Sequence, residues 1–465
     1  MRTKVSFPAL LLLITVAAAL PPVHAQTART EPFVLGADIS WIPQREAEGV
    51  RYAHNGQVRD ILDILKEHRF NYIRLRLFVD PTRVVPEDSI NGLTGAWRAS
   101  PYSRAGYCGL DSTIKFAQRV KNAGFKILLN FHYSDTWADP GKQYMPVSWR
   151  NLTTVDQVAQ RVRTYTRESV QAFKDAGVLP DMVQVGNETI NGMIHPHGRN
   201  WNDSEWRNFA RLIHAGINGV RDVDANIVIM VHSVADSGWS DPNNWLTRLR
   251  TNLNQVEANF FNRINVFGIS YYPRWHGNLT TLQNHLNAII ANRDHNHIRI
   301  NIVEYADLHR GVNDIVFNLP NNRGHGTFVW EPQEFSGDNS LPLFDWRNNR
   351  RETNSRIALY PIMSRDYGND AFTNIAPNTS APARKHNPRN DFHVSHNGVI
   401  TYNSDMPGTV TIYNMQGRVA GRFNVRGPGV YNPAQLTRTP LNPGVYIIAI
   451  EPANGNRQVF NSRIM

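Results

Sequence analysis

Two glutamates at the ends of apolar stretches are the side chains in this sequence best suited to acid–base chemistry. Glu188 closes the stretch MVQVGNE, and Glu304 closes IRINIVE. If both stretches are strands that end at one rim, the two carboxyl groups can flank a single bond. Hydrolysis of a glycosidic bond needs such a pair, because one carboxylic acid protonates the leaving oxygen while one carboxylate attacks or activates water. One strand-end glutamate alone would more simply form an ion pair, so the hypothesis depends on the pair.

Polar and aromatic side chains gather at the ends of the other apolar stretches as well. Sugar rings present apolar C–H faces that stack on aromatic rings, so tryptophans and tyrosines beside paired carboxylates favour a saccharide site. The sequence has no Gly-rich phosphate loop, no CxxC pair and no HExxH motif. The other residues expected at this rim are Asp38, Arg74, Arg76, His132, Tyr133, Asp135, Trp137, Asn187, His232, Tyr271, Tyr272, Trp275, His276, Trp330 and Glu331.

Eight short apolar runs supply these strand ends, and stretches with helical periodicity lie between them. VRDILDILKEH and LDSTIKFAQRVKNAG carry apolar residues three and four positions apart, and Gly124 closes the second. Strands alternating with helices over about 330 residues predict an α/β fold, a (β/α)8 TIM barrel with its site at the carboxyl ends of the strands. A doubly wound open sheet would normally begin with a Gly-rich turn, which FVLGADISWIPQ lacks. The runs begin at Phe33, Tyr72, Phe125, Met182, Ile227, Val266, Ile298 and Gly326.

The two ends of the 465-residue chain indicate an exported protein with a second domain. Residues 1–25 predict a signal peptide, because Arg2 and Lys4 precede the apolar ALLLLITVAAAL and Ala25 ends a small-residue cleavage site. We therefore expect the protein to be secreted or held at the cell surface, with an uncleaved, membrane-anchoring signal as the alternative. Residues 26–372 are expected to form the catalytic domain. Residues 373–390 predict a linker, and residues 391–465 a small all-β, sandwich-like domain.

The cysteine content limits the chemistry expected of the protein, and its charge limits the expected partners. Cys108 is the only cysteine, so no internal disulfide can form, and its loop-like setting in GYCGLD argues against a nucleophile. The net charge is +10, and residues 375–465 hold nine basic and three acidic side chains. Such a tail can be drawn to an anionic surface or polymer. Nucleic acid is not expected as a partner, because these arginines lie between strand-like runs and form no single basic helix.

Seven motifs occur in one order along the chain: GADISWI, NYIRLRLFVDP, NFHYSDTWADPGKQ, MVQVGNET, SYYPRWHG, IVEYA and FVWEP. Through them the region from Phe33 to about Pro361 resembles glycoside hydrolase family 53, the arabinogalactan endo-β-1,4-galactanases. FHYSDTWADP and YYPRWHG are the specific signals, whereas GNE alone would indicate only the wider clan of retaining barrel glycosidases. The resemblance implies an endo-acting enzyme that hydrolyses β-1,4-galactan in pectic side chains and retains the anomeric configuration.

The resemblance also implies roles for individual residues. Glu188 would be the acid/base and Glu304 the nucleophile. We therefore expect a raised pKa for Glu188 and an ionised Glu304. Asn187 would hydrogen-bond the sugar 2-hydroxyl, a contact that strengthens in the transition state.

The residues that support the nucleophile stay open between neighbours in the sequence. Either Arg74 or Arg76 would hold it, and His232 and one of Tyr271 or Tyr272 would pack around it. The sugar subsites would be lined by Asp135, Trp137, Trp275, His276 and Trp330, with Asp38, Arg76 and His132 as further substrate-binding residues.

No metal or cofactor is expected. In bacterial relatives the segment between Glu304 and Trp330 is longer and can hold calcium. Here ADLHRGVNDIVFNLPNNRGHG offers no array of oxygen ligands, so we predict no structural calcium. The HxH pairs His195/His197 and His295/His297 could bind a metal ion, but histidine pairs in loops are more often solvated.

The final segment resembles the C-terminal sorting modules of exported bacterial proteins, through VTIYNMQGRV, NPGVYIIAI and the terminal RIM. This would imply recognition by an export machine. The alternative is an appended β module that holds the enzyme near polysaccharide or the cell surface. We expect a monomer. Two other functions stay open: a β-glycanase of the same clan acting on mannan or xylan, and a non-catalytic carbohydrate-binding protein.

Overall fold

The computed structural model describes residues 29–83, 101–235, 241–335 and 340–372, together with short stretches between 392 and 464. The chain divides into two compact units, residues 1–373 and 374–465. The predicted signal peptide (1–25) and linker (373–390) lie outside the described residues. Within the part of the chain that is described, no helix combines the length and the apolar character needed to cross a membrane.

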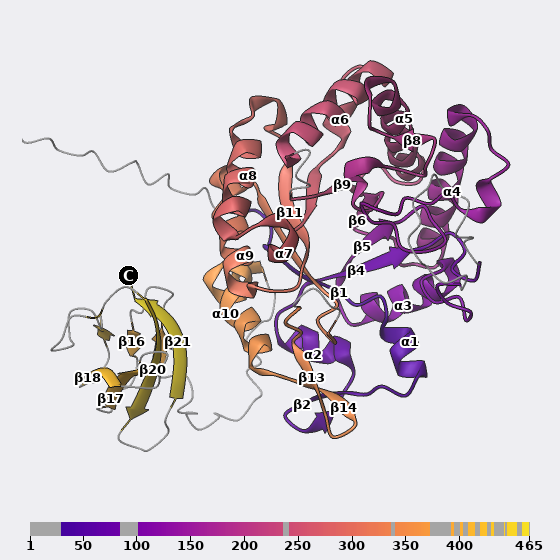
Figure 1. The fold of residues 1–465 in the computed structure, drawn as a ribbon. Helices are drawn as coiled ribbons and strands as arrows, with labels where there is room; N and C mark the ends of the chain where they lie inside the picture. The colour runs from indigo at the N-terminus through magenta and orange to yellow at the C-terminus, as the bar shows by residue number, and fades with distance from the viewer. Residues whose placement is uncertain are drawn as a thin grey trace, which may run out of the picture. The chain divides into compact units, whose positions relative to one another are not determined.

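Eight parallel strands close into a barrel, which confirms the predicted (β/α)8 fold (Figure 1). Neighbouring strands follow chain order around the barrel, and the last strand pairs with the first from Val34↔Gly326 to Asp38↔Trp330. The strands are β1 (Val34–Asp38), β4 (Tyr72–Leu77), β5 (Lys126–Phe131), β6 (Met182–Val185), β9 (Val228–Val234), β10 (Val266–Ser270), β11 (Arg299–Tyr305) and β12 (Gly324–Trp330).

Helices between the strands cover the outside of the barrel, and one large apolar core fills the space between the two layers (Figure 1). The longest helix, α4 (Val155–Asp175), begins with a capping box in which Thr154 and Gln157 satisfy each other's backbone N–H groups. The Asn202 side chain caps α5 (Asp203–Arg221) by accepting the Glu205 N–H. The other main helices are α2 (Ile61–Glu67), α3 (Leu110–Asn122), α6 (Pro242–Val256), α8 (Leu279–Ala291), α9 (His309–Phe317) and α10 (Leu359–Asp366).

Short elements are inserted between the barrel strands and the main helices. Two are helices, α1 (Ile42–Ala47) and α7 (Pro273–His276), and one is the hairpin of β7 (Gly192–Met193) and β8 (Gly198–Arg199). A separate four-stranded sheet joins β13 (Phe344–Arg347), β14 (Arg350–Thr353), β2 (Tyr52–His54) and β3 (Gln57–Val58).

The inside of the barrel has an apolar layer beneath a polar one. Alternate residues of a barrel strand point inward. Two residues after the apolar layer along their strands, the next inward side chains are polar, as at Arg74, Asn130 and His232. Gly36 leaves room for one large member of the layer, because a Cβ there would lie 2.2 Å from the Phe328 ring. The apolar layer consists of Val34, Tyr72, Leu128, Met182, Met230, Val266, Val303 and Phe328.

A β-bulge in β11 sets the direction of Glu304. The pairing with β10 runs from Ile302 directly to Glu304, and between Ile302 and Tyr305 strand β11 has one residue more than the facing stretch of β12. Val303 belongs to the inner apolar layer, whereas Tyr305 belongs to the outer core. The extra residue therefore lets Glu304 face the inside of the barrel directly after Val303.

The C-terminal unit contains two antiparallel sheets, which confirms the predicted small all-β domain. One sheet joins β15 (Phe392–Val394), β16 (Ile400–Tyr402) and β19 (Gly429–Tyr431). The other orders β18 (Val419–Val425), β17 (Gly408–Tyr413), β20 (Gly444–Pro452) and β21 (Gln458–Ile464). Both sheets contribute to one apolar core, formed by Ile400, Val410, Ile412, Val425, Ile448 and Ile450.

Candidate active site

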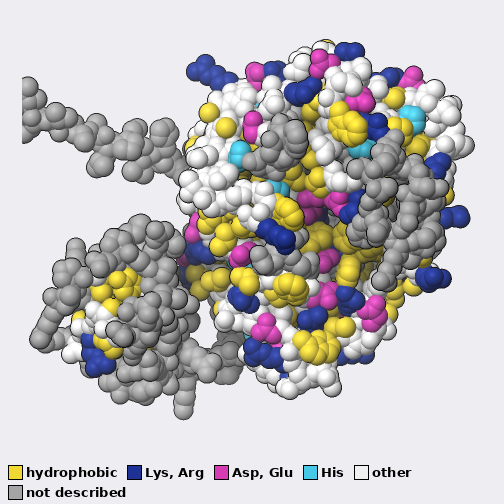
Figure 2. Space-filling model, viewed as in Figure 1, with side chains coloured by type: hydrophobic (Ala, Val, Ile, Leu, Met, Phe, Trp, Pro, Cys, Tyr) yellow, Lys and Arg dark blue, Asp and Glu magenta, His cyan; other side chains and the backbone are white. Residues whose placement is uncertain are grey.

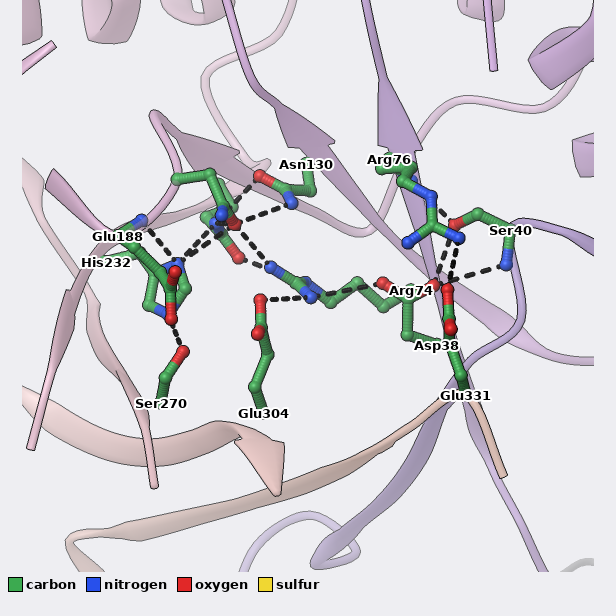
Figure 3. A network of polar contacts seen from close by, with 12 residues as sticks. Asp38, Ser40, Arg74, Arg76, Asn130, Glu188, His232, Ser270, Glu304 and Glu331 are labelled. Carbon is green, nitrogen blue, oxygen red and sulfur yellow. Dashed lines mark hydrogen bonds and ion pairs between the residues drawn. The ribbon is translucent and has the colours of Figure 1, made fainter. Parts of the chain in front are cut away.

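Glu188 and Glu304 approach each other at the carboxyl end of the barrel (Figure 3). One carboxylate oxygen of Glu188 lies within 4.8 Å of one carboxylate oxygen of Glu304. Both side chains line a cleft of about 670 Å³. Figure 2 shows acidic side chains inside a hollow of this face, with hydrophobic side chains beside them. The other lining residues are Trp41, Arg45, Trp137, Ala138, Asp139, Lys142, Asn187, Tyr272, Trp330, Glu331, Glu334 and Phe335.

Arg74 is the arginine that holds Glu304. Its Nη1 lies 2.8 Å from Glu304 Oε1 and 3.1 Å from Asp38 Oδ2, and its Nη2 donates to Asn187 Oδ1 at 2.8 Å. The Arg74 side chain is completely buried, so these charge-assisted contacts fix the carboxylate firmly. The Tyr272 hydroxyl donates to the second oxygen of Glu304 at 3.1 Å.

The substrate-binding residues expected from the sequence included Arg76 and Tyr271. In the structure Glu304 is instead contacted by the neighbours of these residues on the same strand or loop, Arg74 and Tyr272. Arg76 pairs with Glu331 at 2.7 Å, because it lies one inward position further along β4 than Arg74. The Tyr271 ring is buried, and its hydroxyl donates to the Gly277 carbonyl. Tyr271 thus anchors the turn after α7, and the hydroxyl that contacts Glu304 belongs to Tyr272.

Burial and charge give the two glutamates different proton affinities. Burial raises the pKa of Glu188 well above its usual range, and the nearby charge of Glu304 raises it further. Burial also raises the pKa of Glu304, but the charge of Arg74 acts against that rise. Only Glu304 is held by a guanidinium, so it loses its proton before Glu188 does. The direction for Glu188 is the one predicted from the sequence.

The backbone at Glu188 is anchored by His232. Glu188 adopts a left-handed conformation, with φ of 45°, which turns its N–H toward the ring. That N–H donates to His232 Nδ1 at 3.1 Å, and Gln184 Nε2 donates to the same nitrogen at 2.9 Å. Burial, together with the charge of Arg74, lowers the pKa of His232 well below its usual range, so the ring is neutral. A neutral ring with two donors at Nδ1 carries its proton on Nε2.

Glu188, His232 and Glu304 form, within the described ranges, the one group of three donor side chains close enough to share a metal ion. The group fits a metal poorly, because His232 Nδ1 already accepts hydrogen bonds and Nε2 is protonated. His195, from one of the HxH pairs, bonds the Asn191 carbonyl through Nε2. The donor set at the strand ends is better suited to proton transfer than to metal binding.

Asn187, Trp137 and Trp330 lie along the cleft, as the sequence predicts for residues that contact a sugar. The Asn187 side chain is held on both sides. Its Oδ1 accepts from Arg74 and Asn130, and its Nδ2 donates to the Ala138 carbonyl. Asp38 is fully buried and contacts Arg74, so it supports the site from below.

Three other predicted substrate-binding residues have structural contacts instead, and a fourth, Trp275, lies outside the cleft lining. The Asp135 carboxylate accepts the backbone N–H groups of Asp80 and Val147, and it is 1% exposed. His132 Nδ1 accepts the Ala138 N–H, and His276 Nδ1 accepts the Tyr272 N–H. These three side chains shape the loops around the cleft. Trp275 is 61% exposed and is absent from the lining of the described cleft.

Sequence reasoning missed Trp41 and Ser270, and it named Glu331 without a role. Trp41 lines the cleft, and Ser270 lies beside His232. Two signals could have found them. Trp41 lies two residues after the first apolar run, in GADISWI, and Ser270 shares the inward face of its strand with Gly268.

Known proteins share this fold and its motifs. The family model described as glycosyl hydrolase family 53 matches residues 34–309. The arabinogalactan endo-β-1,4-galactanase of Humicola insolens is 34% identical over 262 residues, which cover 55% of this chain and 69% of that protein.

Two solved structures are similar over most of their length. One is the Ignisphaera aggregans GH53 catalytic domain, with 26% identity and a TM-score of 0.59 over 71% of this chain and 96% of that one. The other is a fungal β-1,4-galactanase, with 27% identity and a TM-score of 0.58 over 70% of this chain and 98% of that one. The match over more than half of the sequence agrees with the paired glutamates at the barrel rim: this chain belongs to glycosyl hydrolase family 53 and is a glycoside hydrolase.

Proposed function

We propose that this enzyme is an endo-β-1,4-galactanase that cleaves galactan and arabinogalactan chains by a retaining double displacement. One observation supports the mechanism most strongly: carboxylate oxygens of Glu188 and Glu304 lie within 4.8 Å of each other. Retaining glycosidases hold their two carboxyl groups about 5–5.5 Å apart, whereas inverting ones leave roughly 6.5–9.5 Å for a water molecule. Relatives that share the family are named for arabinogalactan or β-1,4-galactan, which supports the substrate.

In the first half-reaction Glu304 attacks the anomeric carbon of the sugar bound over it. Glu188 gives its proton to the glycosidic oxygen as the bond between that oxygen and the anomeric carbon breaks. Arg74 and Tyr272 hold the attacking carboxylate in place, each through one of its two oxygens. Asn187, fixed by Arg74 and Ala138, donates its second Nδ2 hydrogen to the sugar 2-hydroxyl.

In the second half-reaction water replaces the departed sugar chain. Glu188, now a carboxylate, takes a proton from this water as its oxygen attacks the anomeric carbon. The bond to Glu304 breaks, and both glutamates return to their starting protonation states. Two inversions at one carbon give net retention.

The cleft walls supply the binding surface for the chain. Trp137 and Trp330 have centroids 5.8 Å apart and form one aromatic wall. Galactose carries an axial 4-hydroxyl, so a galactan chain bends differently from a glucan chain, and the shape of such a wall can discriminate between them.

The test is an activity screen on linear β-1,4-galactan, with mannan and xylan as competing polymers and analysis of the released oligosaccharides. We expect internal cleavage of galactan and loss of this activity in Glu188→Gln and Glu304→Gln. Hydrolysis confined to mannan or xylan would contradict the substrate. Full activity in Glu304→Gln would contradict the mechanism. Binding of galacto-oligosaccharides without any turnover would indicate a carbohydrate-binding protein instead.

We also propose that the protein is exported and acts as a monomer outside the cell, with its C-terminal domain recognised by an export machine or by the cell surface. Two sequence features support this proposal. Residues 1–25 have the pattern of a signal peptide, and the final segment carries the motifs VTIYNMQGRV and NPGVYIIAI and the terminal RIM. N-terminal sequencing of protein recovered from culture medium tests the first part, and an intact residue 1 on a cytoplasmic protein would contradict it.

A further inference from the structure

One buried amide side chain joins the two halves of the catalytic pair. Gln184 lies on β6 and is completely buried. On one side its Oε1 accepts from Arg74 Nε at 3.2 Å, and on the other its Nε2 donates to His232 Nδ1 at 2.9 Å. Figure 3 shows Arg74 beside Glu304. It also shows His232 beside Glu188. Gln184 therefore contacts one supporting residue of each glutamate.

The orientation of this amide is fixed by groups that hydrogen-bond in only one direction. The Gly186 carbonyl can only accept, and it lies 2.9 Å from Gln184 Nε2. Asn130 Oδ1 is a second acceptor, 2.7 Å from the same nitrogen. The Arg74 guanidinium can only donate, and it meets Gln184 Oε1. The position therefore needs a side chain that accepts on one face and donates on the other.

On the side of Glu304, the contact with Gln184 directs the guanidinium of Arg74. Nε donates to Gln184, Nη1 lies 2.8 Å from Glu304 Oε1, and Nη2 donates to Asn187 Oδ1 at 2.8 Å. A guanidinium is planar and its donors form a rigid fork, so a bond at Nε sets the directions of the other N–H groups. Without this bond Arg74 would hold Glu304 less firmly.

On the side of Glu188, the contact with Gln184 selects the tautomer of His232. The Nδ1 atom accepts the Gln184 amide and also the Glu188 backbone N–H, at 3.1 Å. A proton on Nδ1 would face the amide hydrogen, so Gln184 favours the ring with Nδ1 free to accept. That nitrogen anchors the left-handed backbone of Glu188, from which the carboxyl group projects.

We propose that Gln184 is a positioning residue for both catalytic glutamates. It directs Arg74 toward Glu304, and it keeps His232 in the tautomer that holds the backbone of Glu188. This inference rests on the proposed function of the site. Gln184 is absent from the lining of the described cleft, so it acts through its two neighbours and touches no sugar.

The test compares variants of Gln184 on two aryl β-galactobiosides. Both substrates need the nucleophile, but a phenol leaving group also needs a proton from the acid, whereas dinitrophenolate leaves without one. Gln184→Met has a similar length and removes both contacts. We expect kcat/KM to fall about tenfold or more for the dinitrophenyl substrate, and about tenfold further for the phenyl substrate.

Gln184→Glu separates the two contacts. A carboxylate still accepts from Arg74, so the nucleophile keeps its support. The second oxygen has no hydrogen to donate to His232 and favours a proton on Nδ1, and a protonated Nδ1 cannot accept the Glu188 N–H. We expect kcat/KM for the phenyl substrate to fall about tenfold or more, and kcat/KM for the dinitrophenyl substrate to stay within about threefold of wild type.

Ser233→Ala is the matched control, because it removes a different buried polar group beside His232. Ser233 is fully buried on β9, and its hydroxyl has no hydrogen-bond partner among the residues that the structure describes. This variant should match wild type on both substrates. Circular dichroism shows which variants are folded, and if Gln184→Met is not, the result for Gln184→Glu decides alone.

Three results would overturn the proposal. One is wild-type kinetics in either variant of Gln184. Another is an equal loss on the two substrates in Gln184→Glu, since that would reflect a general disturbance of the site. The third is a loss confined to the phenyl substrate in folded Gln184→Met, which would leave Gln184 without a role at Glu304. Wild type that turns over both aryl substrates and leaves galactan intact would contradict the polymer assignment alone.

Discussion

The guanidinium of Arg76 lies 2.7 Å from the carboxylate of Glu331, and both side chains are almost completely buried. The guanidinium carbon is 4.4 Å from the Trp137 ring centroid and 5.1 Å from the Trp330 ring centroid. Because both tryptophans line the cleft, this ion pair supports the aromatic wall. Glu304, the proposed nucleophile, is held by a different arginine, Arg74.

Breaking this ion pair should destabilise the fold. Arg76→Met leaves Glu331 buried without its partner, so we expect the free energy of unfolding at pH 8 to fall by about 3 kcal/mol. The double variant Arg76→Met/Glu331→Leu removes both charges and should recover most of the loss. Urea unfolding of the two variants checks this. A single variant as stable as wild type, or a double variant no more stable than the single one, would refute the assignment.

The same pair predicts a pH dependence of stability. Burial raises the pKa of Glu331 from its usual 4.5 to about 7, against the opposing charge of Arg76. The folded state therefore holds a proton that the unfolded state has lost, and this contribution to stability declines as pH rises from about 4.5 to about 7. In Glu331→Gln the decline over this window should be smaller than in wild type. Parallel stability curves for the two proteins would argue against the raised pKa.

Adjacent tyrosines give a matched test of which hydroxyl serves the nucleophile. Tyr272→Phe removes a donor to Glu304, so we expect kcat/KM to fall about tenfold or more. Tyr271→Phe removes only the bond to the Gly277 carbonyl and should leave kcat/KM within about threefold of wild type. Steady-state kinetics on a galacto-oligosaccharide measures both. The reverse ranking would show that the two tyrosines are wrongly assigned.

Replacing Arg74 should shift the acid limb of the pH profile. The charge of Arg74 favours the ionised form of Glu304, so Arg74→Gln should raise the pKa of that carboxyl further. The acid limb of kcat/KM reports ionisation of the nucleophile in the free enzyme and should move to higher pH. Circular dichroism of the variant guards against unfolding as the cause. A folded variant with an unchanged acid limb would place Arg74 outside the electrostatics of Glu304.

The sequence predicted the barrel and its glutamates because both depend on local patterns. Apolar runs mark the strands, and Glu188 and Glu304 close two of them. The bulge at Val303 could not be predicted in the same way, since it is defined by the register of β11 against two strands distant in sequence. It decides that Glu304 points into the barrel.

The choices between neighbouring side chains stayed open for a related reason. Arg74 and Arg76 lie on the same face of β4, so alternation cannot separate them, and only the depth of each along the strand selects its carboxylate. Asp135 was expected to line a sugar subsite because of the family resemblance. Its carboxylate instead accepts two backbone N–H groups, a role that the residue type alone does not reveal.

The anomeric configuration of the first product tests the central claim most directly. Proton NMR can follow the reducing end released from a β-1,4-galacto-oligosaccharide during the first minutes, before mutarotation. Two carboxyl groups with oxygens within 4.8 Å of each other should give the β-anomer first, because the sugar is inverted twice. An α-anomer as the initial product would show a single displacement by water and would contradict the account of Glu304 as nucleophile.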